Sequence, residues 1–333
     1  MLQKVIIDSD WGGDVMQLSS VLLARPAQFE VLGATVTFGN ASLRQNLINA
    51  GAILRFLGFD GFVKRYGGAN APRGVATPPE GDNAHGKTGL GEARLALSGV
   101  EAETEAAIDF LLKTVAEEGE GTITLVATGP QTNVARAIRE APEVMNRLRE
   151  IRIMGGCIRE ILGYRVDQNL NRVEETQVLR KGNITERSEF NFQQAPEDAA
   201  TVLESGIPVA LFPMDCTHQM TFTRERECRL RDIFEAKPEK LEVLVDLLSA
   251  PRLIDEKKWG IAPVMHDVHT TVSMVSPDLY RGQRGRVAVR DGGETDFTVD
   301  ERGPHWVADR IVDPDAVFEL LAESLARLLL QPR

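Results

Sequence analysis

Cysteine and long apolar runs are scarce in this chain of 333 residues, and its 38 basic residues are outnumbered by 49 acidic ones. Its three cysteines, Cys157, Cys216 and Cys228, are too few for a disulfide framework. The formal net charge of −11 disfavours nucleic-acid binding, which depends on basic surfaces. No segment approaches the ~20 apolar residues of a membrane span, and the opening MLQKVIIDSDWGG lacks a secretory signal pattern. We therefore expect a cytoplasmic protein that binds neither nucleic acid nor membranes.

Short apolar runs alternate with helical patterns along most of the chain. Strands are predicted over 4–10, 29–38, 122–128, 149–156 and 207–215, and helices over 15–24, 42–57 and 314–330. A strand-then-helix alternation is typical of a parallel sheet covered by helices. The sequence therefore predicts an α/β fold with a mainly parallel central sheet and helices on both faces. Because no repeat or linker is visible, we expect one domain over 1–333.

Three segments interrupt this alternation. Residues 68–100 are rich in Gly, Pro, Asn and Thr and are predicted to form a long loop, the kind that is often functional. The polar segment 157–182 is predicted to be an exposed insertion. The segments 285–293 and 305–313 suggest a hairpin before the last helix. Ligands of parallel sheets bind beyond the carboxyl ends of the strands, so the residues that follow each strand are the candidates for a site.

The first predicted strand ends in the densest group of carboxylates. Asp8, Asp10 and Asp14 fall within seven residues, next to two glycines that permit a tight turn. Crowded carboxylates repel one another unless a cation or substrate hydroxyls compensate. Oxygen ligands of this kind suit Ca²⁺ or Mg²⁺. Asp14 could instead cap a helix that begins at Val15, although capping requires one acid and not three.

Three further groups have both a functional and a structural interpretation. His266 and Asp267 could be an acid and a metal ligand, or a helix cap beside a solvated imidazole. The turn that begins at Thr128 follows a strand, and its proline could simply start a helix. Glu189 and Asn191 would point the same way in an extended segment, which could also be a polar strand edge.

Taken in order, these motifs resemble those of the inosine–uridine-preferring nucleoside hydrolase family over most of the chain. The matching segments are Asp8 to Val15, Gly39-Asn40, His85 to Gly91, Thr128 to Asn133, Met154 to Gly156, Gly182 to Thr185, Glu189 to Asn191, Pro196 to Ala200, Asp215 to His218, and His266-Asp267. Each motif is weak alone, but their common order makes chance resemblance improbable. The resemblance implies the nucleoside-hydrolase fold and cleavage of the N-glycosidic bond of a ribonucleoside or analogue, giving a free base and ribose.

The resemblance also implies a role for each matching residue. Asp10 would be the base that activates water and a calcium ligand, together with Asp267 and the Thr128 carbonyl. His266 would face the leaving base. The residues implied to bind substrate are Asp14, Asn183, Glu189 and Asn191 at the ribose hydroxyls, Asn40 orienting Asp10 or the sugar, His85 near the base, and Trp11 beside the site. No organic cofactor is implied. A homodimer or homotetramer acting in purine or pyrimidine salvage is expected.

The sequence departs from the family where a second aspartate should bind the metal. In an ungapped alignment that position is Val15, and in a longer spelling of the motif the missing pair falls on Met16 and Gln17. Calcium affinity depends on the number of charged ligands, so we expect weak calcium or none, with Asp8 as a possible substitute ligand. Two alternatives follow: a metal-independent relative acting on another glycoside or a cyclic amide-type substrate, or a non-catalytic sugar- or nucleoside-binding protein. The retained polar groups, Asp10 among them, favour an enzyme.

Overall fold

The computed structural model of this protein describes residues 2–75, 85–166 and 172–331. Parts of the predicted long loop (76–84) and of the predicted insertion (167–171) therefore lie outside the described residues. The strands are β1 (Gln3–Ser9), β2 (Phe29–Val36), β3 (Arg65–Gly67), β4 (Ile123–Ala127), β5 (Glu150–Met154), β6 (Ile161–Val166), β7 (Arg172–Arg180), β8 (Val209–Phe212), β9 (Tyr280–Val289), β10 (Thr295–Val299) and β11 (His305–Ile311). The helices are α1 (Val15–Leu23), α2 (Leu43–Phe56), α3 (Ala107–Glu117), α4 (Thr132–Glu140), α5 (Pro142–Met145), α6 (Phe190–Gln194), α7 (Pro196–Glu204), α8 (Met214–Thr217), α9 (Arg224–Ile233), α10 (Pro238–Leu248), α11 (Arg252–Lys258), α12 (His269–Val275) and α13 (Pro314–Leu329).

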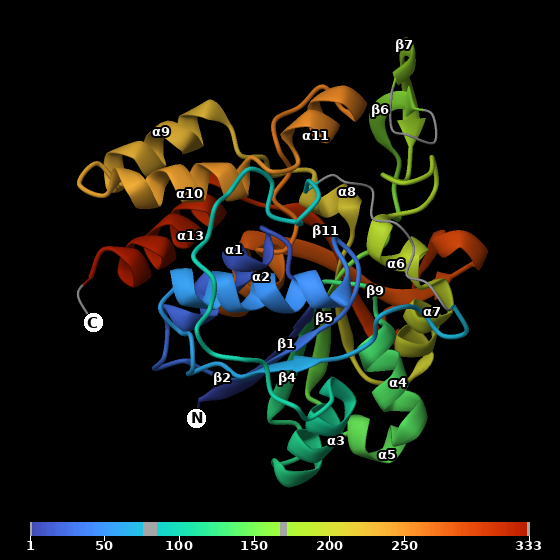
Figure 1. The fold of residues 1–333 in the computed structure, drawn as a ribbon. Coiled ribbons are helices and arrows are strands. Elements are labelled where there is room, and N and C mark those ends of the chain that lie inside the picture. Colours follow the sequence, from blue (N-terminus) through green and yellow to red (C-terminus); the bar gives the residue numbers. More distant parts are fainter. Residues whose placement is uncertain (1, 76–84, 167–171, 332–333) are drawn as a thin grey trace.

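The central sheet has nine strands in the order β10-β9-β11-β8-β5-β4-β1-β2-β3. The pairs from β11 through β8, β5, β4, β1 and β2 to β3 are parallel, whereas β9 runs antiparallel to both β10 and β11. The predicted α/β class and mainly parallel sheet are thus confirmed (Figure 1). The segments 285–293 and 305–313 pair as β9 with β11 but do not form the predicted hairpin, because β10 lies between them in the chain and forms the hairpin with β9.

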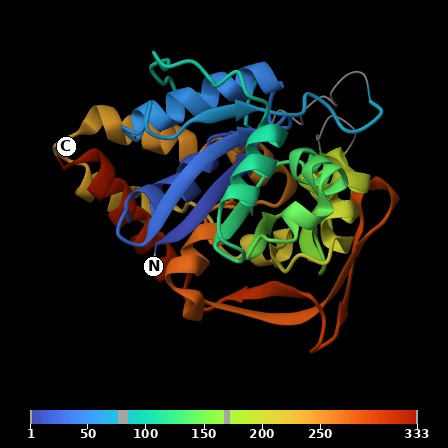
Figure 2. The ribbon, with the colours of Figure 1, turned by 90° about the horizontal axis from the view of Figure 1, so that it is seen from below.

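The central strands β1, β4, β5 and β8 are buried between two layers of helices and are apolar on both faces, whereas β9 and β10 at one edge are partly exposed. Along β1, Val5 and Ile7 join the core beneath α1, α2, α10 and α13, whereas Ile6 joins the core beneath α3, α4 and α7. This alternation follows from the two-residue period of a strand. The two helical layers lie on opposite sides of the sheet in Figures 1 and 2.

Local capping explains where several helices begin. Ser42 accepts a hydrogen bond from the backbone N–H of Gln45 at the start of α2. Asp313 accepts hydrogen bonds from the first turn of α13, which opens with Pro314. Such caps satisfy N–H groups that have no partner within the helix. No helix among the residues that the structure describes is long and apolar enough to cross a membrane.

The predicted insertion contains a separate two-stranded antiparallel sheet, β6 with β7. Leu162 and Leu179, which pair across this hairpin, are exposed. The hairpin and α11 lie side by side (Figure 1), and Gly163 of the hairpin packs against the ring of Trp259, at the end of α11. A Cβ at Gly163 would lie 2.6 Å from that ring, so only glycine permits this contact. The hairpin therefore supports α11, which covers part of the site.

Candidate active site

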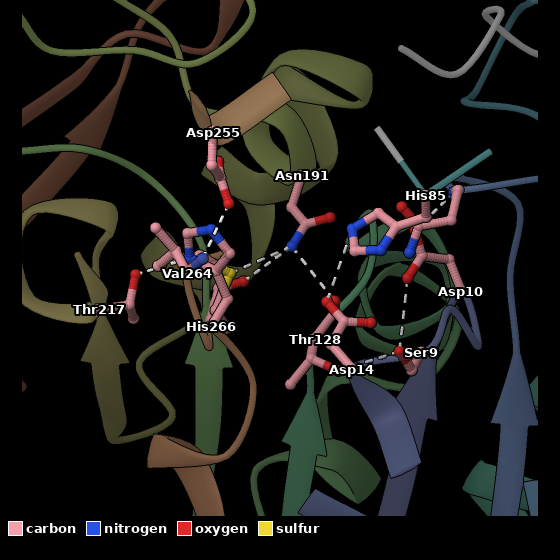
Figure 3. Close-up of polar contacts among 12 residues, drawn as sticks. Ser9, Asp10, Asp14, His85, Thr128, Asn191, Thr217, Asp255, Val264 and His266 are labelled. Atoms are coloured by element: carbon pink, nitrogen blue, oxygen red, sulfur yellow. Dashed lines mark hydrogen bonds and ion pairs between the residues drawn. The ribbon is translucent and has the colours of Figure 1, made fainter. Parts of the chain in front are cut away.

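One pocket gathers polar side chains from the carboxyl ends of the parallel strands and from the loops above them. It is lined by Asp10, Asp14, Asn40, His85, Thr128, Met154, Asn183, Glu189, Phe190, Asn191, His218, Pro251, Ile254, Asp255, Lys258, Trp259, His266 and Asp267. Figure 3 shows that Asp10, Asp14 and His85 lie on one side of Asn191. His266 and Asp255 lie on the other side. The pocket therefore has a carboxylate end and an end built from histidines and α11.

Asp10 is held at the carboxylate end by the turn after β2. The backbone N–H of Asn40 donates to Oδ2 of Asp10 at 2.7 Å. Gly39 has φ of +150°, and a Cβ there would lie 2.1 Å from the same carboxylate oxygen. Burial, then the negative charges of Asp14 and Glu189, raises the pKa of Asp10 well above its usual value. The result is a fixed, unusually basic carboxylate facing the pocket.

Asp14 occupies the N-cap position of α1, but its side chain makes no capping hydrogen bond. Oδ2 of Asp14 lies 4.0 Å from Nε2 of His85 instead. Its other oxygen, Oδ1, is buried without a hydrogen-bond partner among the described residues. The simple capping interpretation of Asp14 is therefore wrong, and the carboxylate is available to a ligand.

Two residues that the sequence suggested for the site lie outside the pocket lining. The indole of Trp11 is fully buried in the apolar core, and its N–H approaches the Thr35 carbonyl at 3.4 Å. The φ of +39° at Trp11 belongs to the left-handed region, and this turn of the backbone accompanies an indole placed inward. Asp8 accepts hydrogen bonds from Thr35 and Asn133 through Oδ1. Neither residue is placed to contact a substrate in this structure.

Glu189 and Asn191 both reach the pocket, but not from an extended segment. Glu189 is the N-cap of α6, and its carboxylate accepts from the N–H groups of Asn191, Phe192 and Gly156 at 2.8, 3.2 and 2.8 Å. These bonds connect α6 to the end of β5. The expectation of an extended strand edge is therefore wrong, and the helix start explains why both side chains lie in one place.

Thr128 and Asp267 come from distant segments and complete the carboxylate end. The amide of Asn191 donates to the carbonyls of Thr128 and Met154 at 3.2 and 3.1 Å. Oδ2 of Asp267 is buried without a hydrogen-bond partner among the described residues. Burial, followed by the charges of Asp14 and Asp10, raises the pKa of Asp267 well above its usual value.

His266 lies at the other end of the pocket, with Nδ1 at 2.7 Å from the hydroxyl of Thr217. Its ring centroid is 5.7 Å from that of His218. Burial, followed by the neighbouring histidines, lowers the pKa of His266 well below its usual value. Burial also lowers the pKa of His218 to about 3. Both rings are therefore neutral near pH 7.

Comparison with known proteins agrees with this arrangement. The profile of the inosine-uridine preferring nucleoside hydrolase family matches residues 5–319. The chain belongs to this family. It is 30% identical to an uncharacterized protein of Schizosaccharomyces pombe, over 98% of this chain and 99% of that protein. It is 29% identical to a pyrimidine-specific ribonucleoside hydrolase of Citrobacter koseri, also over 98% of this chain and 99% of that protein.

The solved structure of a purine-preferring ribonucleoside hydrolase from Gardnerella vaginalis has a similar fold. Its TM-score is 0.83 at 26% identity, covering 99% of this chain and 100% of that chain. The predicted family, nucleoside-hydrolase fold and cleavage of a ribonucleoside N-glycosidic bond are confirmed. This nucleoside hydrolase is an N-glycosyl hydrolase.

The calcium site implied by the family does not fit the residues of this nucleoside hydrolase. Val15 and Met16 are fully buried in the apolar core, so neither position brings an oxygen ligand to the pocket. Within the described part of the chain, no group of three or more His, Cys, Asp or Glu side chains could hold a metal ion. Too few ligands are therefore present to assign a catalytic step to calcium.

Sequence reasoning missed most of the second end of the pocket. Asp255, Lys258 and Trp259 come from α11 and the residue after it, and His218 follows α8. His218 stood in a recognised motif but had no assigned role. The charged residues of the segment IDEKKWG fit a solvent-exposed helix face as well as a binding site, so nothing in the sequence favoured the binding site.

Proposed function

We propose that this N-glycosyl hydrolase binds the ribose of a nucleoside among its buried carboxylates and uses Asp10 to activate water. The observation that carries this proposal is the pair of buried oxygens without partners, Oδ1 of Asp14 and Oδ2 of Asp267. Buried polar atoms are rarely left without hydrogen bonds, and sugar hydroxyls are donors that would satisfy them. Asn40, Asn183, Glu189 and Asn191 line the same pocket and are proposed to bind or orient the sugar.

In the proposed reaction, a water molecule gives a proton to Asp10 while its oxygen forms a bond to C1′ of the ribose. The C1′–N bond breaks, and its electron pair leaves with the base. Positive charge develops on the sugar during this step, and nearby carboxylates stabilise that charge. Asp10 then returns its proton to solvent. The raised pKa of Asp10 makes it a stronger base than an ordinary aspartate.

His266 is proposed to assist the leaving base as a neutral hydrogen-bond donor. The lowered pKa of His266 disfavours an imidazolium at rest, so His266 is not proposed to act as a charged acid. A neutral ring keeps one N–H, which can stabilise charge on the departing nitrogen. Solvent then protonates the base, and free base and ribose are the products. His85 lies near Asp14 and is proposed to contact the substrate at the junction of the two ends.

Cytoplasmic action in nucleoside salvage, as a homodimer or homotetramer without an organic cofactor, remains a prediction. The alternative of a binding protein without turnover requires only the pocket, whereas a hydrolase also needs a base, and Asp10 is a fixed carboxylate with a raised pKa that can serve as one.

The purified protein should release ribose from at least one common ribonucleoside, measured as reducing sugar. The 2′-deoxy analogue of the best substrate should react far more slowly, because it lacks a hydroxyl for the carboxylate end. Binding of nucleosides by calorimetry without any release of ribose would instead support the non-catalytic alternative.

A further inference from the structure

Helix α11 presents two charged side chains to the pocket at the end remote from the carboxylates. Asp255 and Lys258 are three residues apart, so they lie on the same face of the helix. Both line the pocket and both are buried, with Lys258 fully so. Charged side chains are seldom buried in this way unless they have specific partners.

Backbone contacts fix the positions of these two side chains. Oδ2 of Asp255 accepts a hydrogen bond from the N–H of Val264 at 2.8 Å. Nζ of Lys258 donates to the carbonyl of Asn183. A carboxylate can accept about four hydrogen bonds and an ammonium can donate three, so groups of these two kinds can contact the protein and a ligand at the same time. Backbone contacts thus hold both groups in place at the wall of the pocket.

The surroundings of Lys258 are suited to a flat ring. Trp259 is buried next to it, and the Trp259 ring meets the ring of His218 edge-on with centroids 4.6 Å apart. Ile254 and Phe190 add apolar surface to the same lining. A planar base could lie against these groups with its edge directed at α11.

We propose that Asp255 and Lys258 determine which leaving base is accepted, by binding an N–H next to a carbonyl, the lactam edge of an oxo-base. This inference rests on the proposed function and adds the residues that recognise the base. The carboxylate of Asp255 accepts from the ring N–H, and the ammonium of Lys258 donates to the adjacent carbonyl. Uracil, hypoxanthine and guanine carry this edge. Cytosine and adenine present a bare ring nitrogen beside an amino group, which places acceptor against acceptor and donor against donor.

A purely structural role for Lys258 makes a different prediction. Its contact with Asn183 joins α11 to the loop before α6, so removal of the ammonium could loosen the pocket as a whole. A loosened pocket would lower turnover of every nucleoside by a similar factor. If Lys258 recognises the base, its removal should instead change the ratio of kcat/KM between nucleosides. That ratio therefore distinguishes the two roles.

The test compares kcat/KM for uridine against cytidine, and for inosine against adenosine, in the unmodified enzyme and in Lys258→Met. The matched control is Lys257→Met, which removes the same charge from the exposed neighbouring position. We expect the unmodified enzyme and the control to prefer the oxo-base within each pair by about tenfold or more. Lys258→Met should reduce both preferences to within about threefold. Unchanged preferences in Lys258→Met, or no preference in the unmodified enzyme, would overturn the proposal.

Two further measurements keep the proposal testable when Lys258→Met does not fold or no nucleoside is cleaved. Asp255→Asn replaces an acceptor by an amide that can donate, and we expect it to shift the ratio toward cytidine and adenosine. Calorimetry of the free bases with the unmodified enzyme requires no turnover: uracil should bind more tightly than cytosine. Tighter binding of uracil without ribose release would contradict the proposed function alone, whereas cleavage without base preference would contradict only the role of α11.

Discussion

The hydroxyl oxygen of Thr217 lies 2.7 Å from Nδ1 of His266 and 3.2 Å from the carbonyl oxygen of Met214. A threonine hydroxyl carries one proton and donates to only one of these atoms. A separation of 2.7 Å is typical of an O–H donor and short for an N–H donor, which favours donation by Thr217 to Nδ1 and leaves Nε2 of the neutral ring as the N–H donor. We infer that Thr217 is a positioning residue that selects the histidine tautomer required at the leaving base.

Thr217→Val should therefore slow cleavage of natural nucleosides by about tenfold or more while KM changes little. An activated substrate such as nitrophenyl riboside needs less help and should be nearly unaffected. His266→Ala should show the same dependence on the leaving group, with a larger loss. Thr217→Ser keeps the hydroxyl and should recover most of the activity. Equal losses of activity on natural and activated substrates would show that Thr217 contributes only to packing.

Asp10→Asn should leave the fold intact and remove about a hundredfold or more of turnover, because an amide cannot act as a general base. The amide oxygen can still accept the hydrogen bond from Asn40, so the local geometry should survive. Circular dichroism and thermal unfolding check the fold, and steady-state kinetics measure the loss. Activity near that of the unmodified enzyme would contradict the proposed mechanism.

Gly39→Ala tests how closely the backbone approaches that carboxylate. The new methyl would lie 2.1 Å from Oδ2 of Asp10, so the carboxylate must move. Gly206→Ala is the control, because Gly206 also has a positive φ, +87°, but a Cβ there meets nothing within 4 Å. Gly206→Ala should lose about 1 kcal/mol of unfolding free energy, and Gly39→Ala should lose more, because its methyl also displaces a buried carboxylate. Only Gly39→Ala should lose activity, by about tenfold or more; equal kinetics in the two variants would refute the coupling.

The sequence allowed the sheet and most of the carboxylate end to be predicted, because those features follow from local patterns. Asp10 and Thr128 come directly after buried strands, and parallel strands bring their carboxyl ends together. Trp11 could not be placed correctly, since its direction depends on a left-handed φ at a non-glycine residue. Glu189 was placed on an extended edge because glutamate is an uncommon N-cap.

The end formed by α11 could not be predicted, because it depends on packing between distant segments. Asp255 and Lys258 reach the pocket only because Trp259 is held against the β6–β7 hairpin and Lys258 contacts Asn183. Nothing in a short charged helix indicates which face meets a ligand. The burial of Val15 and Met16 in the core could not be predicted either, because it depends on how α1 packs against the sheet.

The stability of the protein should fall as the pH drops below about 6.5, partly through His218. Burial lowers the pKa of His218 to about 3 in the folded protein, from the ordinary value of 6.5. Between these values the unfolded chain binds a proton that the folded protein excludes, so acid favours unfolding. One such group contributes a slope of about 1.4 kcal/mol per pH unit. Urea unfolding at pH 7 and pH 5 should show a smaller pH difference for His218→Gln; the same difference as in the unmodified protein would exclude His218 as a source.

Val15→Asp tests the alignment that would make position 15 a calcium ligand. The structure places Val15 fully within the apolar core, so an aspartate there loses its hydration without reaching the pocket. We expect Val15→Asp to lower the free energy of unfolding by about 3 kcal/mol or more in the presence of a chelator. Val21→Asp is the matched control, because Val21 is fully buried in the same core and on the same helix.

Addition of calcium separates the two interpretations of position 15. If Val15 is only a core residue, millimolar calcium should leave the melting temperatures of both variants unchanged. A rise confined to Val15→Asp would show that the aspartate reaches a metal, since binding to the folded state raises stability by mass action.

For the unmodified protein we expect weak calcium binding by calorimetry in the absence of substrate, because the carboxylates of Asp10 and Asp267 and the Thr128 carbonyl supply few of the six to eight oxygens that Ca²⁺ takes. Tight stoichiometric binding would contradict this expectation and point to Asp14 as the additional ligand, which Asp14→Asn would then weaken.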